Sequence, residues 1–222
     1  PNALSIEQAI SNILKTIKVK SSSENVQLKN SCDRILAKNI RSKIDVPNYK
    51  NSAMDGYAIN IKNFSNQNKI FKCVGESFAG NAYTKAVKPN HAIKVMTGGN
   101  VPDSCNAVVM KELVESYEDE IKVLAPIVKD QNIRFPGEDI RKNQVVLTKG
   151  KRINEIDIGI LASLGISSVP VFKMPLIGFV STGDELVSIK KKIKKNQVYD
   201  SNRYLLHGLL RKYPVQLKDY GV

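Results

Sequence analysis

Tryptophan is absent from this 222-residue sequence, and aromatic residues make up only 6% of it. Proteins that bind single-stranded nucleic acids stack successive bases on aromatic side chains. So small an aromatic content therefore argues against nucleic acid as a partner, although the net charge of +13 at pH 7 invites that interpretation.

Cysteine and histidine are also scarce. Cys32, Cys73 and Cys105 are odd in number and widely spaced, and only His91 and His207 could join them in a metal site. This usage predicts a reducing cytoplasm and no zinc centre. No apolar run approaches the roughly 18 residues of a membrane span, and the first residues lack signal-peptide character. We expect a cytoplasmic protein with no membrane partner.

The positive charge is spread along the chain, and only Lys190 to Lys195 forms a dense basic run. Such a run is usually a solvated loop or a loosely anion-attracting one. A basic chain that handles a small anionic ligand fits the composition as well as a nucleic-acid-binding module does.

Helix and strand signals alternate at the start of the chain. Ser5 and Gln8 have capping-box spacing before a helical apolar pattern that runs to Ile17. Ser31 predicts a second cap with a brief helix through Leu36, and residues 40–46 alternate as a strand does. Residues 1–45 are interpreted as the first part of a small domain.

Residues 46–135 read as an all-β module with turns between short strands. The expected strands are Ile70–Val74, Ala92–Thr97, Ala107–Lys111 and Ile121–Val128.

Helical and strand character returns in residues 136–175. A strand is expected at Val145–Leu147, then a helix with Asn154 as N-cap and Gly165 just beyond its end, then a strand at Val169–Phe172. We infer that the β module is inserted into one small domain.

Residues 176–222 open with the apolar run Leu176–Val180, which is typical of a strand covered on both faces. A helix capped by Asp200 or Ser201 follows a lysine-rich loop, so this segment predicts the first βα unit of an open α/β sheet. Ligands bind at the C-terminal ends of strands in such sheets, where Asp184 and Glu185 fall. The alternative is that these carboxylates cap a helix.

Two turns in the β module carry candidate polar groups. Asn51, Ser52 and Asp55 cluster before Gly56, and Thr97 precedes two glycines. Taken alone, Asp-Gly between strands is a common hairpin signal, and Gly-rich turns are usually only turns.

Four motifs occur in order along the chain. They are NSAMDGYA at residues 51–58, VMTGGNVP at 95–102, GED at 137–139, and IGFVSTGDEL at 177–186 followed by DSN at 200–202. Together they resemble the molybdopterin molybdenumtransferase family, which includes MoeA and the E domain of gephyrin.

The resemblance implies an α+β multidomain protein: a small helical and strand linker domain with an inserted all-β domain, followed by the start of an open α/β domain. It also implies a homodimer that inserts molybdate into adenylylated molybdopterin with Mg²⁺ and releases AMP. The molybdopterin adenylyltransferase of the same pathway would then be a partner.

The family's functional positions map onto this sequence residue by residue. The matching catalytic residues are Asp55, Thr97 and Glu185; the substrate-binding residues are Ser52, Arg134, Asp139, Thr182 and Gly183; the metal-binding residues are Asp184 and Glu185. For Arg134 and Asp139 a second interpretation has equal weight: the two residues form a local ion pair across the Pro136-Gly137 turn.

The sequence stops at Val222, early in the α/β domain of the family pattern. We therefore expect a fragment that is folded but inactive alone. A scaffold or interaction fragment of the same fold is the other interpretation.

Overall fold

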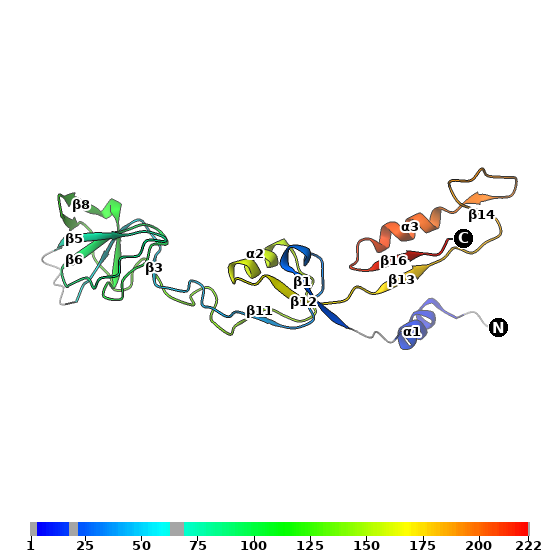
Figure 1. Cartoon of the computed structure of the whole chain (residues 1–222), viewed down its shortest axis with the longest axis horizontal. Coiled ribbons are helices and arrows are strands. Elements are labelled where there is room, and N and C mark those ends of the chain that lie inside the picture. The colour runs from blue at the N-terminus through cyan, green and yellow to red at the C-terminus, as the bar shows by residue number, and fades with distance from the viewer. Residues whose placement is uncertain (1–3, 18–21, 63–68, 222) are drawn as a thin grey trace. The chain divides into compact units, whose positions relative to one another are not determined.

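The computed structural model describes residues 4–17, 22–62 and 69–221 (Figure 1). The chain divides into two compact units, one of residues 41–146 and one of residues 1–40 with 147–222. Each unit is described by itself. The expected domain limits at residues 45/46, 135/136 and 175/176 stay predictions.

The unit of residues 41–146 is built from strands and short turns. Its main sheet has six strands in the order β7-β4-β6-β5-β9-β8, in which β5 and β6 are parallel and the other neighbours antiparallel. A separate two-stranded pair joins β3 to β10. The elements are β3 (Asn51–Ser52), β4 (Gly56–Ile59), β5 (Ile70–Ser77), β6 (His91–Val95), β7 (Ala107–Met110), the 3-10 helix η2 (Lys111–Leu113), β8 (Val114–Tyr117), β9 (Glu120–Val123) and β10 (Ile133–Arg134).

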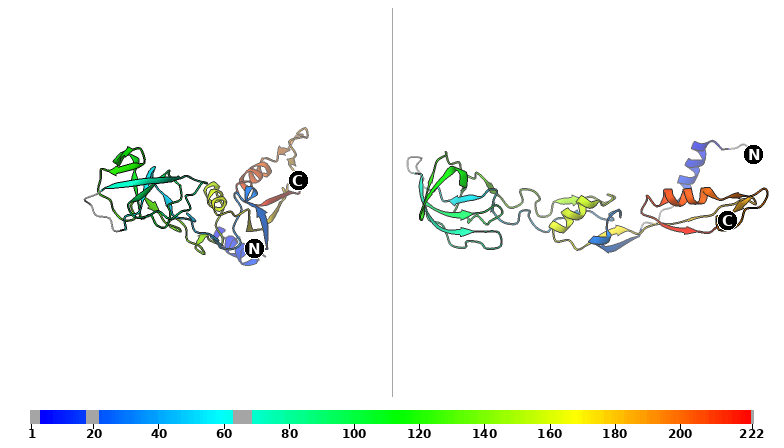
Figure 2. Two further views of the ribbon diagram at one scale, coloured as in Figure 1. Left: turned by 60° about the vertical axis from the view of Figure 1, so that its left-hand side comes forward. Right: turned by 90° about the horizontal axis from the view of Figure 1, so that it is seen from above.

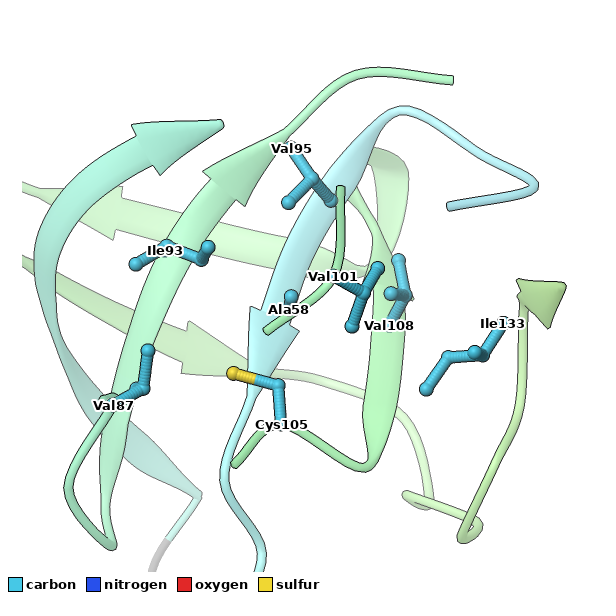
Figure 3. Close-up of a cluster of buried hydrophobic side chains, with 8 residues drawn as sticks. All are labelled: Ala58, Val87, Ile93, Val95, Val101, Cys105, Val108 and Ile133. Carbon is cyan, nitrogen blue, oxygen red and sulfur yellow. The ribbon is translucent and has the colours of Figure 1, made fainter. Parts of the chain in front are cut away.

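Both faces of this sheet are covered by apolar side chains. Because successive residues of a strand point to opposite faces, Ala58 belongs to one cluster and Ile59 to the other. Figure 3 shows the first cluster, in which Ile93 and Val95 of β6 lie near Val101 and Cys105 from the following loop. The strand expected at Ile121–Val128 ends earlier, at Val123, and β8 was not predicted.

The other unit contains the three α-helices of the described residues. Its elements are α1 (Ile6–Thr16), β1 (Ser23–Gln27), the 3-10 helix η1 (Leu28–Asn30), β2 (Ile40–Arg41), β11 (Val145–Leu147), α2 (Glu155–Ser163), β12 (Ser168–Phe172), β13 (Leu176–Phe179), β14 (Leu186–Val187), β15 (Val198–Tyr199), α3 (Ser201–Leu210) and β16 (Gln216–Asp219), with β2 and β11 lying at the junction of the two units. The antiparallel pair of β1 and β12 joins two segments far apart in sequence.

Local capping signals predicted α1 and α2 correctly. Ser5 and Gln8 form the expected capping box, and Asn154 with Asp157 forms another. Gly165 follows the C-cap of α2 at φ 70°, a left-handed conformation that glycine adopts without a steric penalty. Leu161 and Leu164 are buried, whereas Ile156 is 73% exposed, so the predicted apolar face of α2 is only partly covered.

The prediction of a brief helix after Ser31 is wrong. Leu36 donates its backbone N–H to the Lys151 carbonyl at 2.9 Å, and Phe172 donates to the Ile35 carbonyl at 2.8 Å. These long-range bonds hold the backbone extended, and Ser31 instead ends η1. The strand expected at residues 40–46 is also wrong beyond Arg41, because Val46 makes only an isolated bridge with Ile140.

Residues 176–221 form one small α/β segment. β13 pairs in parallel with β16, and α3 lies beside these strands (Figure 2). The Phe179 ring of β13 meets the His207 ring of α3 edge-on, with centroids 6.4 Å apart. Leu176 and Val180 are exposed, contrary to the expectation of a strand covered on both faces, because β16 is the one strand of the described residues that pairs with β13.

Candidate functional site

The register of the main sheet brings Asp55 and Thr97 together. β4 begins at Gly56, which pairs with Val95 near the end of β6. Asp55 just precedes β4 and Thr97 just follows β6, so both lie at the same end of the antiparallel pair. Asp55 Oδ1 accepts two hydrogen bonds there, from the Thr97 backbone N–H and from the Thr97 hydroxyl, each at 2.8 Å.

The second oxygen of Asp55 faces a cation. Lys111 Nζ lies 3.8 Å from Asp55 Oδ2, and both side chains are partly accessible to solvent. The Thr97 backbone N–H, then the Thr97 hydroxyl, and to a smaller extent the Lys111 charge lower the pKa of Asp55. The site therefore presents an ionised carboxylate with one oxygen held by Thr97 and the other, in a partly accessible side chain, next to Lys111.

Backbone hydrogen bonds hold the two turns of the site against each other. Gly98 N–H donates to the Ser52 carbonyl at 2.8 Å, and Ser52 N–H donates to the Gly99 carbonyl at 3.0 Å. The Tyr49 hydroxyl adds a bond to the Gly98 carbonyl at 2.9 Å. Gly98 has φ 79°, which explains why a glycine follows Thr97.

Ser52 itself is buried below this surface. Its hydroxyl donates to the Met54 carbonyl at 2.5 Å and accepts from the Met54 N–H at 3.3 Å. This local turn shapes the chain just before Asp55. A direct contact of Ser52 with substrate stays a prediction.

Gly56 is required by the packing of β4. A Cβ atom at this position would stand 1.9 Å from the Val109 carbonyl oxygen of the neighbouring strand β7. Only glycine allows the two strands to approach so closely next to Asp55.

Arg134 and Asp139 form an ion pair in the same unit. Arg134 donates to Asp139 Oδ1 at 2.5 Å and lies 3.6 Å from Glu138 Oε1. The Asp139 carboxylate, through its hydrogen bond, raises the pKa of Arg134. This is the local pair that the sequence left as an alternative, and a role of Arg134 in substrate binding stays a prediction.

Thr182, Gly183, Asp184 and Glu185 lie in an exposed loop after β13. A Cβ atom on Gly183 would stand 2.8 and 2.9 Å from the Glu185 carboxylate oxygens, so the glycine makes room for that carboxylate. Among the described helices, α3 is the next in the chain and is capped by Asp200. Asp184 and Glu185 therefore do not serve as its cap.

Sequence reasoning missed Lys111 as a neighbour of Asp55, and it missed a buried carboxylate oxygen of Asp200. Lys111 lies beside Asp55 only because β4 pairs with β7, Gly56 opposite Met110, and no local pattern predicts that register. Asp200 was predicted as a cap, and its Oδ1 accepts from Arg203 N–H at 3.1 Å. Its Oδ2 is buried and lacks a hydrogen bond within the described residues, which the sequence did not indicate.

In residues 4–17, 22–62 and 69–221, no three His, Cys, Asp or Glu side chains come together as a metal-binding group. A role of Asp184 and Glu185 as Mg²⁺ ligands stays a prediction. Within the same ranges no helix is long and apolar enough to cross a membrane.

Comparison with known proteins gives consistent matches. The molybdopterin molybdenumtransferase of Haemophilus influenzae is 37% identical over 220 residues, covering 99% of this chain and 54% of that protein. The enzyme of the same name from Staphylococcus epidermidis is 31% identical over 224 residues, covering 99% and 53%. The chain thus spans about half the length of these curated relatives.

A crystal structure described as the molybdopterin biosynthesis moeA protein of Pyrococcus horikoshii OT3 superposes with a TM-score of 0.88 at 34% identity, covering 97% of this chain and 59% of that one. The family described as "MoeA N-terminal region (domain I and II)" matches residues 4–165, well over half of the sequence. The chain therefore belongs to the MoeA N-terminal region family.

Proposed function

We propose that this chain supplies the N-terminal part of a molybdopterin molybdenumtransferase, which inserts molybdate into adenylylated molybdopterin and releases AMP. The observation that carries the proposal is the Asp55 carboxylate, anchored through Oδ1 by two Thr97 donors. An anchored carboxylate with a second oxygen can orient a substrate hydrogen-bond donor or a metal-bound water. The names of the relatives support the reaction class.

In this proposal Asp55 acts as an orienting acceptor. Thr97 fixes its position and keeps it ionised, and Lys111 offers a positive charge next to the second oxygen. An ammonium group at that place would lower the repulsion between the carboxylate and an anionic substrate. A bound Mg²⁺ would neutralise substrate oxyanions. Asp184 and Glu185 would contribute ligands to it, usually through waters.

The domain arrangement is part of the same proposal: a linker domain interrupted by the β module, followed by the start of an open α/β domain. The small βαβ segment of β13, α3 and β16 supports the last part, because it has the parallel pair and covering helix of such a fold. A homodimer and a pathway partner, the molybdopterin adenylyltransferase, are proposed on the resemblance alone.

The test uses a chimera in which residues 1–222 replace the matching part of the Haemophilus influenzae relative. We expect the chimera to form cofactor from adenylylated molybdopterin, molybdate and Mg²⁺. Asp55→Asn should lower the rate by about 100-fold, the scale of a lost orienting contact. Asp103→Asn, an exposed aspartate of the same unit, is the matched control and should leave the rate unchanged. A chimera that folds but forms no cofactor would overturn the proposal.

Subunit mixing tests the proposed dimer. Chimeras with Asp55→Asn or Glu185→Ala are each expected to lose most of their activity. If the active form is a dimer whose sites combine groups from two copies, mixing the two variants should restore part of the activity. No recovery after confirmed subunit exchange would rule out that arrangement.

A further inference from the structure

A cavity of about 700 Å³ lies where the chain passes from β12 to β13. Its ten lining residues come from positions 22, 34 and 35, from residues 172–175, and from residues 213–215 between α3 and β16. Seven of the ten are apolar or aromatic, among them Phe172, Met174 and Val215, and none is acidic. None of them belongs to the unit that carries Asp55.

Backbone hydrogen bonds fix the walls of this cavity. Lys173 N–H donates to the Ser22 carbonyl at 2.9 Å, and Gln216 N–H donates to the Pro175 carbonyl at 2.9 Å. The first bond ties the stretch after β12 to the residue before β1, and the second ties it to the start of β16. The cavity therefore has a defined shape before any ligand enters, as most small-molecule sites do.

Arg34 supplies a buried hydrogen-bond donor to the cavity lining. Only 11% of its side chain is exposed. Its Nη2 donates to the Phe172 carbonyl at 2.8 Å and to Glu24 Oε1 at 2.6 Å, and these two bonds hold the guanidinium in place. Its Nε is buried and has no hydrogen-bond partner among the described residues. Because an unpaired buried donor costs free energy, an acceptor supplied by a ligand would be stabilising.

Glu24 determines which charge such a ligand should carry. Its carboxylate pairs with Arg34 and compensates the guanidinium charge. An ionised ligand at Arg34 would therefore meet the Glu24 carboxylate, and it would also lose its hydration in a mostly apolar space. Lys173 lines the cavity too, but it is exposed to solvent, which weakens its attraction for an anion. A neutral acceptor such as a carbonyl oxygen satisfies Nε without these costs.

We propose that this cavity binds a neutral, flat aromatic molecule that carries a carbonyl acceptor. Its volume is within the usual range of small-molecule sites. The apolar lining removes the ring from water, and the rings of Phe172 and Tyr213 offer aromatic contacts. Arg34 Nε orients the molecule by donating to its carbonyl oxygen. The site has no part in the proposed transferase function and goes beyond it.

The test is a fluorescence titration of the 222-residue chain with prodan, a neutral dimethylaminonaphthyl ketone whose emission moves to shorter wavelength in apolar surroundings. Two compounds with the same ring change only the acceptor: dimethylaminonaphthalene lacks it, and dimethylaminonaphthoate is ionised. We expect prodan to bind with a saturable blue shift and each of the other two to bind at least tenfold more weakly. A lost hydrogen bond to a charged donor has about that effect.

Three variants distinguish this cavity from exposed apolar surface elsewhere, such as the residues of α1. Val215→Phe puts a ring into the cavity and should weaken prodan binding at least tenfold. Val180→Phe makes the same change at an exposed position outside the cavity and should weaken it less than threefold. Arg34→Lys keeps a cation beside Glu24 but lacks Nε, so prodan should lose its advantage over dimethylaminonaphthalene. The unfolding temperature of each variant is measured alongside, and the two valine variants decide the result if Arg34→Lys is unstable.

Three results would overturn the inference. They are a blue shift that does not saturate, equal weakening by the two valine variants, and equal affinity of the parent chain for all three compounds. Hydrogen exchange gives an independent measurement: bound prodan should slow exchange at the Lys173 and Gln216 amides, and unchanged rates at saturation would place the probe elsewhere. These assays involve no transferase activity, so their result is independent of the proposed function.

Discussion

Thr97 donates its backbone N–H and its hydroxyl to the same oxygen of Asp55, each at 2.8 Å. The two residues are 42 positions apart, and the antiparallel pairing of β4 with β6 brings them together at one end of these strands. Thr97 alone thus fixes the position of the Asp55 carboxylate and favours its ionised form.

Thr97→Val is expected to raise the pKa of Asp55, because it removes the hydroxyl donor and keeps the backbone donor. A lowered pKa in the folded state contributes stability above the unfolded pKa of about 3.9, and this stability disappears as the pH falls through the folded value. The variant should therefore be less stable than the parent at pH 7 and equal to it in strong acid. NMR titration of the Asp55 carboxyl carbon measures the shift; Thr97→Ser, which keeps the hydroxyl, is the control.

Lys111→Met should raise the pKa of Asp55 by less than Thr97→Val does, because the charge of Lys111 is the smallest of the contributions that lower it. The pair is exposed, so stability should change little. In the chimera we expect a higher KM for the anionic substrate with a smaller change in kcat, because Lys111 is proposed to act on binding. An unchanged KM at low salt would contradict this role.

The capped helices show what the sequence could predict. Asn154 and Gly165 mark the two ends of α2 by signals within a few residues of each end, and both were predicted correctly. Ile35 and Leu36 could not be predicted in the same way, because their backbone partners, Phe172 and Lys151, are more than 100 residues away.

Two glycine-to-alanine substitutions should distinguish the effect of a steric clash from the effect of helix propensity on stability. Gly56→Ala would place Cβ 1.9 Å from the Val109 carbonyl oxygen and should lower the free energy of unfolding by about 1–3 kcal/mol or more. Gly159→Ala lies in α2 with no atom within 4 Å of the new Cβ and should raise stability by about 0.5–1 kcal/mol. Urea titration measures both. If Gly56→Ala left the free energy of unfolding unchanged, β4 and β7 would be able to move apart at low energetic cost.

Cys105 should resist alkylation. Burial raises the pKa of its thiol to about 12, so at pH 8 roughly one molecule in 10,000 carries the reactive thiolate. Iodoacetamide at pH 8 is expected to modify Cys105 only after unfolding, as followed by mass spectrometry of peptides. Cys32 and Cys73, which are partly accessible, are the internal comparison. Rapid modification of Cys105 in the folded chain would contradict its burial.

At the candidate site, too, contacts between residues close in sequence could be predicted and contacts that depend on strand pairing could not. The motif resemblance gave Asp55 and Thr97, and the structure places them in direct contact. Lys111 was missed because its contact with Asp55 depends on the register of β4 against β7. The Arg134–Asp139 ion pair was foreseen as an alternative because the two residues are only five positions apart.

The pairing of β1 with β12 also constrains the order of folding. Val26 pairs with Val169, so this contact closes a loop of about 140 residues. Once residues 41–146 are folded, the 3.0 Å bond from Ser42 N–H to the Gln144 carbonyl shortens the flexible part of that loop to about 40 residues and reduces its closure entropy by about 1 kcal/mol. The β1–β12 contact is therefore expected to form late, and destabilising the β module should slow its appearance.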